Sequence, residues 1–215
     1  MTGSNRFALT MICFSLVIAA SMLIKKPASS EQAEPKLLTK DYAQMNAAVE
    51  EVLKDMPEIK EELEFIRSGV NANETDTLFT VKKAEFRIRV ENNFTKQEHS
   101  PEFMRSMAER ENGRYWDALR IAEEEYGVKV KEEEVTEFIK EYAAAVRSKE
   151  KERYAEVLDL TLEELDYQFD RDFYVMDLLW KKLMPLVEEK YPMQEGESKK
   201  AYSERVKEEF LNEEG

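Results

Sequence analysis

The sequence predicts an all-α protein, in which an apolar N-terminal segment precedes an irregular helical bundle. Three observations predict this fold class. Apolar residues recur at spacings of three and four along most of the chain after residue 37, which is the period of a helix buried on one side. Serine, threonine and proline precede several of these segments, and glycine follows some of them, as at helix ends. Residues 86–90 also alternate like a strand, but no second strand is available to pair with them.

The N-terminal segment from Phe7 to Ile24 has 18 residues without a charge, between Arg6 and the pair Lys25-Lys26. That length just crosses a bilayer as a helix, and the small residues that follow also fit a secretory signal. We therefore expect residues 1–26 to be a signal-anchor helix or a cleaved signal peptide. The first case gives a single-pass membrane protein with its helical domain on the extracytoplasmic side, and the second gives a secreted protein. Because the flanking basic residues are nearly balanced, a reversed anchor with a cytosolic domain stays open.

The chain after this segment is acidic. Residues 27–37 are polar, with two prolines and no helical period, so we expect a linker there and a helical domain at residues 38–215. After residue 30 the chain carries 29 basic against 46 acidic side chains, a formal charge of −17. This charge argues against nucleic-acid binding, which needs a basic surface. Cys13 is the single cysteine, so the exported domain has no disulfide, which fits a bacterial envelope.

The first helices of the domain are predicted from apolar spacing. One helix runs from Leu38 to Val52, and a short second one from Pro57 to Ile66, before a loop at residues 71–77. Residues 86–94 match both a strand and a helix. We favour the helix because a lone strand would have no partner.

The most specific helix signals flank residues 100–127. Ser100-Pro101-Glu102 supplies a capping serine, a proline at the first helical position and an acid in the first turn. The helix is expected to continue to Tyr126, with a bend at Asn112-Gly113. Gly127 is expected to end it in a left-handed conformation.

Three further helices are predicted in the C-terminal half. An apolar stripe over residues 135–146 alternates with Glu and Lys, and the charged residues 147–153 continue or follow that helix. Residues 161–164 form a capping box that opens a long helix, which Pro185 should kink near its end. The stripe of this helix is Leu162, Leu165, Phe169, Phe173, Met176, Trp180, Leu183 and Val187. A last helix is expected over residues 198–211.

The sequence lacks the patterns of a catalytic or metal site. His99 is the single histidine, and Ser100 beside it is explained as a helix cap. Consecutive acids on a helix point in different directions, so the runs at 123–125 and 132–134 and the pair Asp170/Asp172 are interpreted as solvated faces rather than cation sites. No zinc spacing, glycine-rich loop or nucleophile elbow is present. We therefore expect no enzyme activity, no metal and no cofactor.

Aromatic and methionine side chains are the remaining candidates for function. The chain has 11 Phe, 9 Tyr, 10 Met and 2 Trp, and such side chains suit adaptable binding of varied partners. For any one of them, an ordinary place in the core is the more frequent alternative. The candidate client-binding residues are Met104, Trp116, Phe138, Tyr142, Phe173 and Trp180.

Two stretches of the domain resemble a known family. Residues 118–130 (ALRIAEEEYGVKV) with Glu133-Glu134-Val135 form a helix, a glycine, a short extended link and an acidic helix start, and residues 158–165 (LDLTLEEL) form a turn before a long amphipathic helix. Both are similar to the N-terminal chaperone domain of the SurA/PrsA-type foldases, over about residues 80–190. The resemblance implies a helical peptide-binding fold like that of SurA N-terminal and trigger-factor domains. No parvulin domain follows, so prolyl isomerase activity is not implied.

The resemblance and the composition together predict a membrane-tethered, non-catalytic chaperone-like protein. It would bind unfolded or extended segments of exported polypeptides, with the membrane contacted through residues 7–24 and no nucleic-acid partner. The alternative is a membrane-anchored scaffold or regulatory protein that binds one specific folded partner through a helix face.

Overall fold

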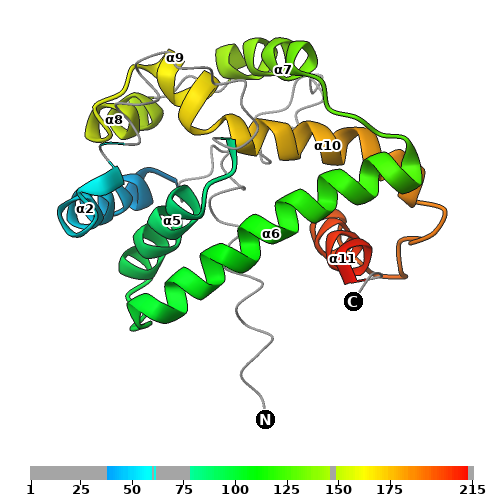
Figure 1. Ribbon diagram of the computed structural model, residues 1–215, viewed down its shortest axis with the longest axis horizontal. Helices are drawn as coiled ribbons and strands as arrows, with labels where there is room; N and C mark the ends of the chain where they lie inside the picture. Colours follow the sequence, from blue (N-terminus) through cyan, green and yellow to red (C-terminus); the bar gives the residue numbers. More distant parts are fainter. Residues whose placement is uncertain (1–37, 60, 62–77, 146–148, 213–215) are drawn as a thin grey trace.

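The computed structural model describes residues 38–59, 61, 78–145 and 149–212, and every regular element in this part of the chain is helical (Figure 1). This confirms the predicted all-α class. The elements are α2 (Leu38–Asp55), α5 (Val81–Phe94), α6 (Pro101–Tyr126), α7 (Glu132–Ala145), α8 (Lys149–Val157), α9 (Leu162–Glu164), the π-helical turn η3 (Leu165–Phe169), α10 (Arg171–Val187) and α11 (Lys199–Asn212).

The predicted N-terminal helix (residues 1–26), the linker (27–37) and most of the short helix expected from Pro57 to Ile66 lie outside the described residues. Within the described ranges, each helix is either too short or too polar to cross a bilayer.

Helix α6 is the long central element of the fold (Figure 1). Its 26 residues contact α5 near its start and α10 and α11 further along. Ser100 caps it by accepting a hydrogen bond from the Phe103 amide at 3.2 Å, and Gly127 ends it at φ 64°. A bend was also predicted at Asn112-Gly113, but α6 continues as a regular helix through both residues. The local signals of this helix were therefore sufficient to fix its two ends.

Helix α5 settles the one ambiguity of the sequence in favour of a helix. It lies between α2 and α6 and contacts both. Phe86 and Val90 pack toward α2, while Ala84 and Ile88 pack toward α6. Burial on two sides explains why apolar residues alternate along this segment like those of a strand.

The long helix predicted after Thr161 is interrupted. The capping box is present, with the Glu164 amide donating to the Thr161 hydroxyl at 3.1 Å and the Thr161 amide to the Glu164 carboxylate at 2.7 Å. After α9 the chain widens into the π turn, closed by a hydrogen bond from the Asp170 amide to the Leu165 carbonyl at 2.8 Å. Helix α10 then begins afresh at Arg171 and ends at Val187, two residues beyond Pro185.

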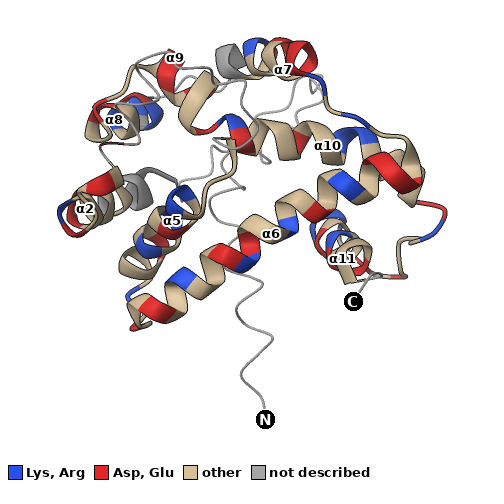
Figure 2. Ribbon diagram, in the orientation of Figure 1, with Lys and Arg blue, Asp and Glu red and all other residues tan. Residues whose placement is uncertain are grey.

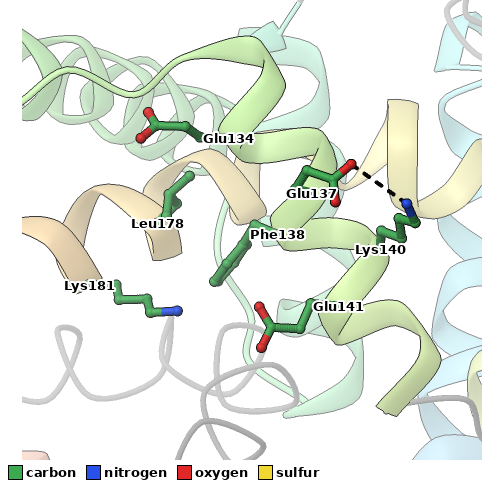
Figure 3. Close-up of a pocket in the computed structure, with 7 residues that line it drawn as sticks. All are labelled: Glu134, Glu137, Phe138, Lys140, Glu141, Leu178 and Lys181. Carbon is green, nitrogen blue, oxygen red and sulfur yellow. Dashed lines mark ion pairs between the residues drawn. The ribbon is translucent and has the colours of Figure 1, made fainter.

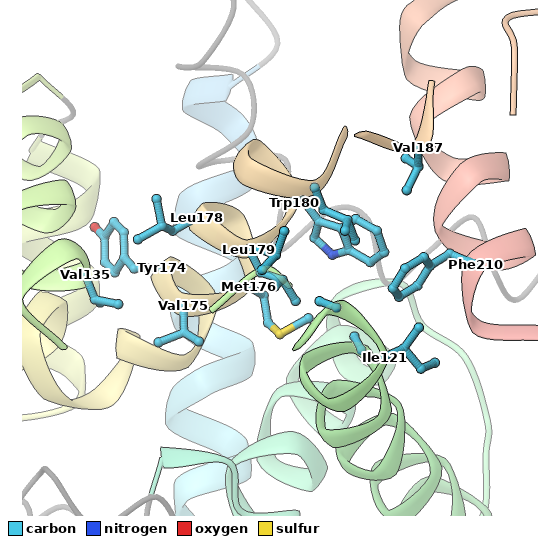
Figure 4. Close-up of a cluster of buried hydrophobic side chains, with 14 of the residues drawn as sticks. Ile121, Val135, Tyr174, Val175, Met176, Leu178, Leu179, Trp180, Val187 and Phe210 are labelled. Carbon is cyan, nitrogen blue, oxygen red and sulfur yellow. The ribbon is translucent and has the colours of Figure 1, made fainter. Parts of the chain in front are cut away.

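The buried apolar side chains form three clusters. The largest joins α10 to α6, α7 and α11 (Figure 4). The second joins α2 and α5 to α8 and η3, and the third lies between α5 and the start of α6. Among the described residues, the large apolar side chains left exposed are Phe103, Leu186 and Met193. In the part of the chain that the structure describes, most aromatic and methionine side chains are therefore at least partly buried and not free to bind.

Candidate functional site

Four charged side chains are buried where α5 meets the start of α10. Lys83, Arg87, Asp170 and Asp172 have side chains that are 1%, 6%, 13% and 3% exposed. The two guanidinium nitrogens of Arg87 donate to the two carboxylate oxygens of Asp172 at 2.5 and 3.0 Å, and one of them also donates to Asp170 at 3.0 Å. The Lys83 ammonium lies 3.4 Å from Asp172. We call this set the buried ion cluster.

Aromatic rings enclose the cations of the buried ion cluster. The Arg87 guanidinium carbon lies 3.8 Å from the centroid of the Phe173 ring and 5.1 Å from that of Phe169. Arg87 also donates to the Phe169 carbonyl at 3.0 Å, and Lys83 donates to the Leu78 carbonyl at 3.0 Å. Such contacts are strong when water is excluded, because no solvent competes with the ring or the carbonyl.

The two carboxylates of the cluster differ in their affinity for a proton. Burial raises the pKa of Asp170 to about 6, although Arg87 opposes this shift. Burial also acts to raise the pKa of Asp172, but Arg87 and Lys83 outweigh it and hold that pKa below its usual value. Asp172 thus stays ionised, while Asp170 can take up a proton in mildly acidic solution.

The π turn and the helix break bring these groups together. Asp170 lies at the junction, with φ −95° and ψ 9°, outside the regular helix on either side. Its carboxylate and that of Asp172 therefore both reach Arg87. The interpretation of Asp170 and Asp172 as a solvated face was wrong, because both are paired with cations from α5. A signal was available in the sequence: Lys83 and Arg87 share the helix face of Phe86 and Val90.

The buried ion cluster is built to hold helices together. Its charged groups are paired with one another, with carbonyls and with aromatic rings, and among its polar atoms the Arg87 Nε is buried without a hydrogen-bond partner. A broken buried pair is costly, whereas an intact one fixes the relative positions of the elements that carry it. We assign it the role of setting α5 against η3 and α10.

A depression of about 510 Å³ lies between α7 and α10 (Figure 3). Its apolar residues are Phe138 and Leu178, which are 4% and 8% exposed. The Phe138 ring packs on Tyr142 at a centroid distance of 4.4 Å. The full lining is Glu134, Glu137, Phe138, Lys140, Glu141, Leu178 and Lys181. We call this feature the α7–α10 depression.

A cation lies over Phe138 of the α7–α10 depression and over its neighbour Tyr142. The Lys181 ammonium is 5.2 Å from the centroid of the Phe138 ring and 5.6 Å from that of Tyr142. Figure 3 shows this ammonium and the Glu141 carboxylate on either side of the Phe138 ring. The depression thus combines a flat aromatic surface with charges of both signs at its rim, which suits an amphipathic side chain.

The carboxylates of the rim are held to different degrees. Glu134 accepts hydrogen bonds from Lys182 at 2.8 Å and from the Lys131 amide at 3.0 Å, and these bonds lower its pKa. Glu137 is 3.7 Å from Lys140. Glu141 is exposed and forms no ion pair with another residue in the described part of the chain. The acidic first turn of α7 adds further negative charge nearby (Figure 2).

The six candidate binding residues do not form one surface. Phe138 lines the α7–α10 depression and packs on Tyr142, and Phe173 lies against Arg87 in the buried ion cluster. The other three belong to the core or pack against it. Trp180 is buried against Phe210 at a centroid distance of 5.2 Å, Trp116 packs half-buried on Phe79 at 5.2 Å, and Met104 is buried between α5 and α6.

The single histidine lies away from both sites. The Nε2 atom of His99 is 2.8 Å from the Gln97 side-chain oxygen, and its ring packs on Phe103. In the described part of the chain, no three His, Cys, Asp or Glu side chains are grouped so as to hold a metal ion.

No protein-family model matches the chain, and no curated protein or solved structure matches it either. Its function is therefore inferred from the residues of the fold.

Proposed function

We propose that this chain is a non-catalytic polypeptide-binding protein, tethered to a membrane by residues 7–24, that holds unfolded or extended segments of exported proteins on its extracytoplasmic domain. The observation that carries the proposal is the α7–α10 depression, where the ammonium of the exposed Lys181 lies over the Phe138 ring and over the neighbouring Tyr142 ring. Its volume lies within the range of sites that take small ligands or a few side chains.

The composition of the depression favours binding over catalysis. Its lining consists of three glutamates, two lysines, one phenylalanine and one leucine. Covalent catalysis would require an activated nucleophile within hydrogen-bond reach of a base. Glutamates and lysines around an aromatic ring instead supply reversible contacts to the backbone and side chains of a peptide.

The acidic surface supports a role with exposed apolar clients. The chain has a formal charge of −14, and like charges keep complexes from associating with one another. Because the exposed apolar area is small, each molecule is proposed to hold a short segment of its client. We therefore expect protection of a client at near-stoichiometric ratios.

An aggregation assay tests this proposal. The full chain is placed in nanodiscs of zwitterionic lipid and mixed with a chemically unfolded exported protein, whose light scattering is followed on dilution. We expect scattering to fall as the ratio approaches one chain per client, and empty nanodiscs to have no effect. Unchanged scattering, together with no detectable binding of unfolded client, would contradict the proposal.

A scaffold that binds one folded partner is the second candidate, and the scarcity of exposed apolar side chains among the described residues favours it. Crosslinking in cells separates the two functions. A photoreactive residue replaces the exposed Lys140 at the rim of the depression. Adducts with many exported proteins would support the chaperone-like function, and one dominant adduct would support the scaffold.

A further inference from the structure

We infer that the α7–α10 depression is specific for basic side chains of its peptide, and that Lys181 occupies the position which such a side chain takes when a peptide binds. This inference rests on the proposed function and names its substrate class: polypeptide segments in which a Lys or Arg adjoins apolar residues.

The position of Lys181 indicates the chemistry of the occupant. Its ammonium lies over two aromatic rings at 5.2 and 5.6 Å, within the range at which a ring attracts a cation. Lys181 is exposed and forms no ion pair with another residue in the described part of the chain. The rings are therefore contacted by a flexible, solvated side chain that can move aside at low cost.

The charge of the rim complements a basic ligand. Three glutamates and two lysines line the depression, and one of these lysines is Lys181 itself. When Lys181 swings out, Glu134 stays paired with Lys182 and Glu137 with Lys140, so Glu141 is the lining carboxylate that has no ion pair with another described residue. The exposed Glu141 then lies beside the Phe138 ring, whereas Glu137 points toward Lys140.

A second lysine on α11 provides a matched comparison. The Lys207 ammonium lies 5.3 Å from the centroid of the Trp180 ring, a cation–ring contact of the same kind. Lys207 does not belong to the depression, and Trp180 is buried between α10 and α11. We therefore expect that removing the charge of Lys207 leaves peptide binding unchanged.

Fluorescence anisotropy with the full chain in zwitterionic nanodiscs tests the inference. Three labelled peptides share one apolar sequence and carry Arg, norleucine or Glu at the central position. We expect the Arg peptide to bind about 3- to 10-fold more tightly than the norleucine peptide, with the Glu peptide weakest. The preference for Arg should shrink at high salt, because the rim charges are exposed.

Two substitutions test the assigned roles. Lys181→Met keeps the apolar part of the side chain and should tighten binding of the Arg peptide about 3-fold or more, whereas Lys207→Met should leave it unchanged. Glu141→Gln should weaken binding of the Arg peptide and leave that of the norleucine peptide unchanged. Thermal unfolding of each variant verifies that the fold is kept.

The outcomes separate the inference from the proposed function. Equal affinity for all three peptides, unchanged by Lys181→Met, would overturn the basic-side-chain specificity and leave peptide binding intact. An equal gain from Lys181→Met and Lys207→Met would overturn the role assigned to Lys181. Absence of binding by every peptide would overturn both the inference and the proposed function at this site.

Discussion

The buried ion cluster and the α7–α10 depression both contain a cation stacked on two aromatic rings, but the cation is buried in the first and exposed in the second. Each places a cation on a pair of rings, Arg87 on Phe169 and Phe173 in the cluster, and Lys181 on two rings of α7 in the depression. Arg87 is 6% exposed and is held by two aspartates and a carbonyl. Lys181 is exposed. The same interaction is thus fixed in one region and exchangeable in the other.

Solvent accounts for this difference. In the cluster, water cannot replace a lost partner, so a broken pair leaves an uncompensated buried charge. In the depression, water screens the charges and can solvate a displaced lysine. Helix α10 therefore has a fixed contact at its start, between Asp172 and Arg87, and an exchangeable contact further along, between Lys181 and the rings of α7. Fixed charges set the geometry of the fold, and solvated charges are left to meet a partner.

The largest effect is expected from Asp172→Ala. This change leaves Arg87 and Lys83 without the carboxylate that pairs with both of them. Breaking a buried pair typically lowers the free energy of unfolding by about 3–5 kcal/mol. Urea unfolding of the full chain, followed by far-UV circular dichroism, measures the loss.

A double variant shows whether the loss comes from unpaired charge. Lys83→Met with Asp172→Leu removes one cation and one anion, and leaves Arg87 beside Asp170 at 3.0 Å. We expect this variant to be more stable than Asp172→Ala alone, since no net charge is stranded. If Asp172→Ala cost less than about 1 kcal/mol, the cluster would not fix the fold as argued.

A smaller effect is expected from pH. The folded-state pKa of Asp170 is about 6, above its ordinary value of 3.8, because the side chain is buried. The folded protein therefore binds this proton more tightly than the unfolded chain, so the free energy of unfolding should rise as the pH falls from about 7 to 5. A shift of about two pKa units corresponds to at most about 3 kcal/mol. Burial raises the pKa of Asp177 to about 6 and of Glu91 to about 7, which acts in the same direction.

Asp170→Asn isolates the contribution of this one group. The amide oxygen can still accept from Arg87 but does not titrate, so the variant should show a flatter rise in stability between pH 7 and 5. Below pH 4 the low pKa of Asp172 reverses the trend, because its protonation breaks the pair with Arg87. Urea unfolding at a series of pH values measures both limbs. Identical pH slopes for the variant and the native chain would exclude Asp170 as their source.

The features that could be predicted from the sequence are those that depend on residues close together in the chain. Ser100, Gly127 and the capping box at Thr161 form within a few residues of one another, so their helix ends follow from local chemistry. The stripe of Phe138 and Tyr142 is likewise a spacing of four on one helix. These local features were enough to predict the all-α class and the α7 side of the α7–α10 depression.

The rest depends on contacts between distant parts of the chain. The π turn has no sequence signature, and an α-helical count through Phe169 misplaces Asp170 and Asp172. Their partners on α5 are 83 or more residues away, so no spacing rule joins them. The same holds for Lys181, whose arrival over Phe138 depends on how α10 packs against α7. In the sequence, the one indication that charges would be buried was that Lys83 and Arg87 share a helix face with apolar residues.

The smallest effect is expected at the rim of the depression. The Glu137 and Lys140 side chains are 72% and 70% exposed and 3.7 Å apart. A double-mutant cycle of Glu137→Gln and Lys140→Gln should give a coupling energy below about 0.5 kcal/mol, because exposed pairs gain little over their solvated states. The same cycle on Lys83→Met and Asp172→Leu should give a coupling several times larger, since both groups are buried.

These two cycles measure the difference between the regions directly. Each compares one lysine with one acid at a similar separation, 3.7 Å at the rim and 3.4 Å in the cluster. The pairs differ in burial and also in partners, because Asp172 is bound by Arg87 as well, whereas Glu137 and Lys140 lie one turn apart on one helix. A rim coupling above about 1 kcal/mol would mean that the exposed pair is held as firmly as a buried one. The depression would then be a rigid surface, and displacement of its charges by a peptide would carry a cost that the proposed binding does not include.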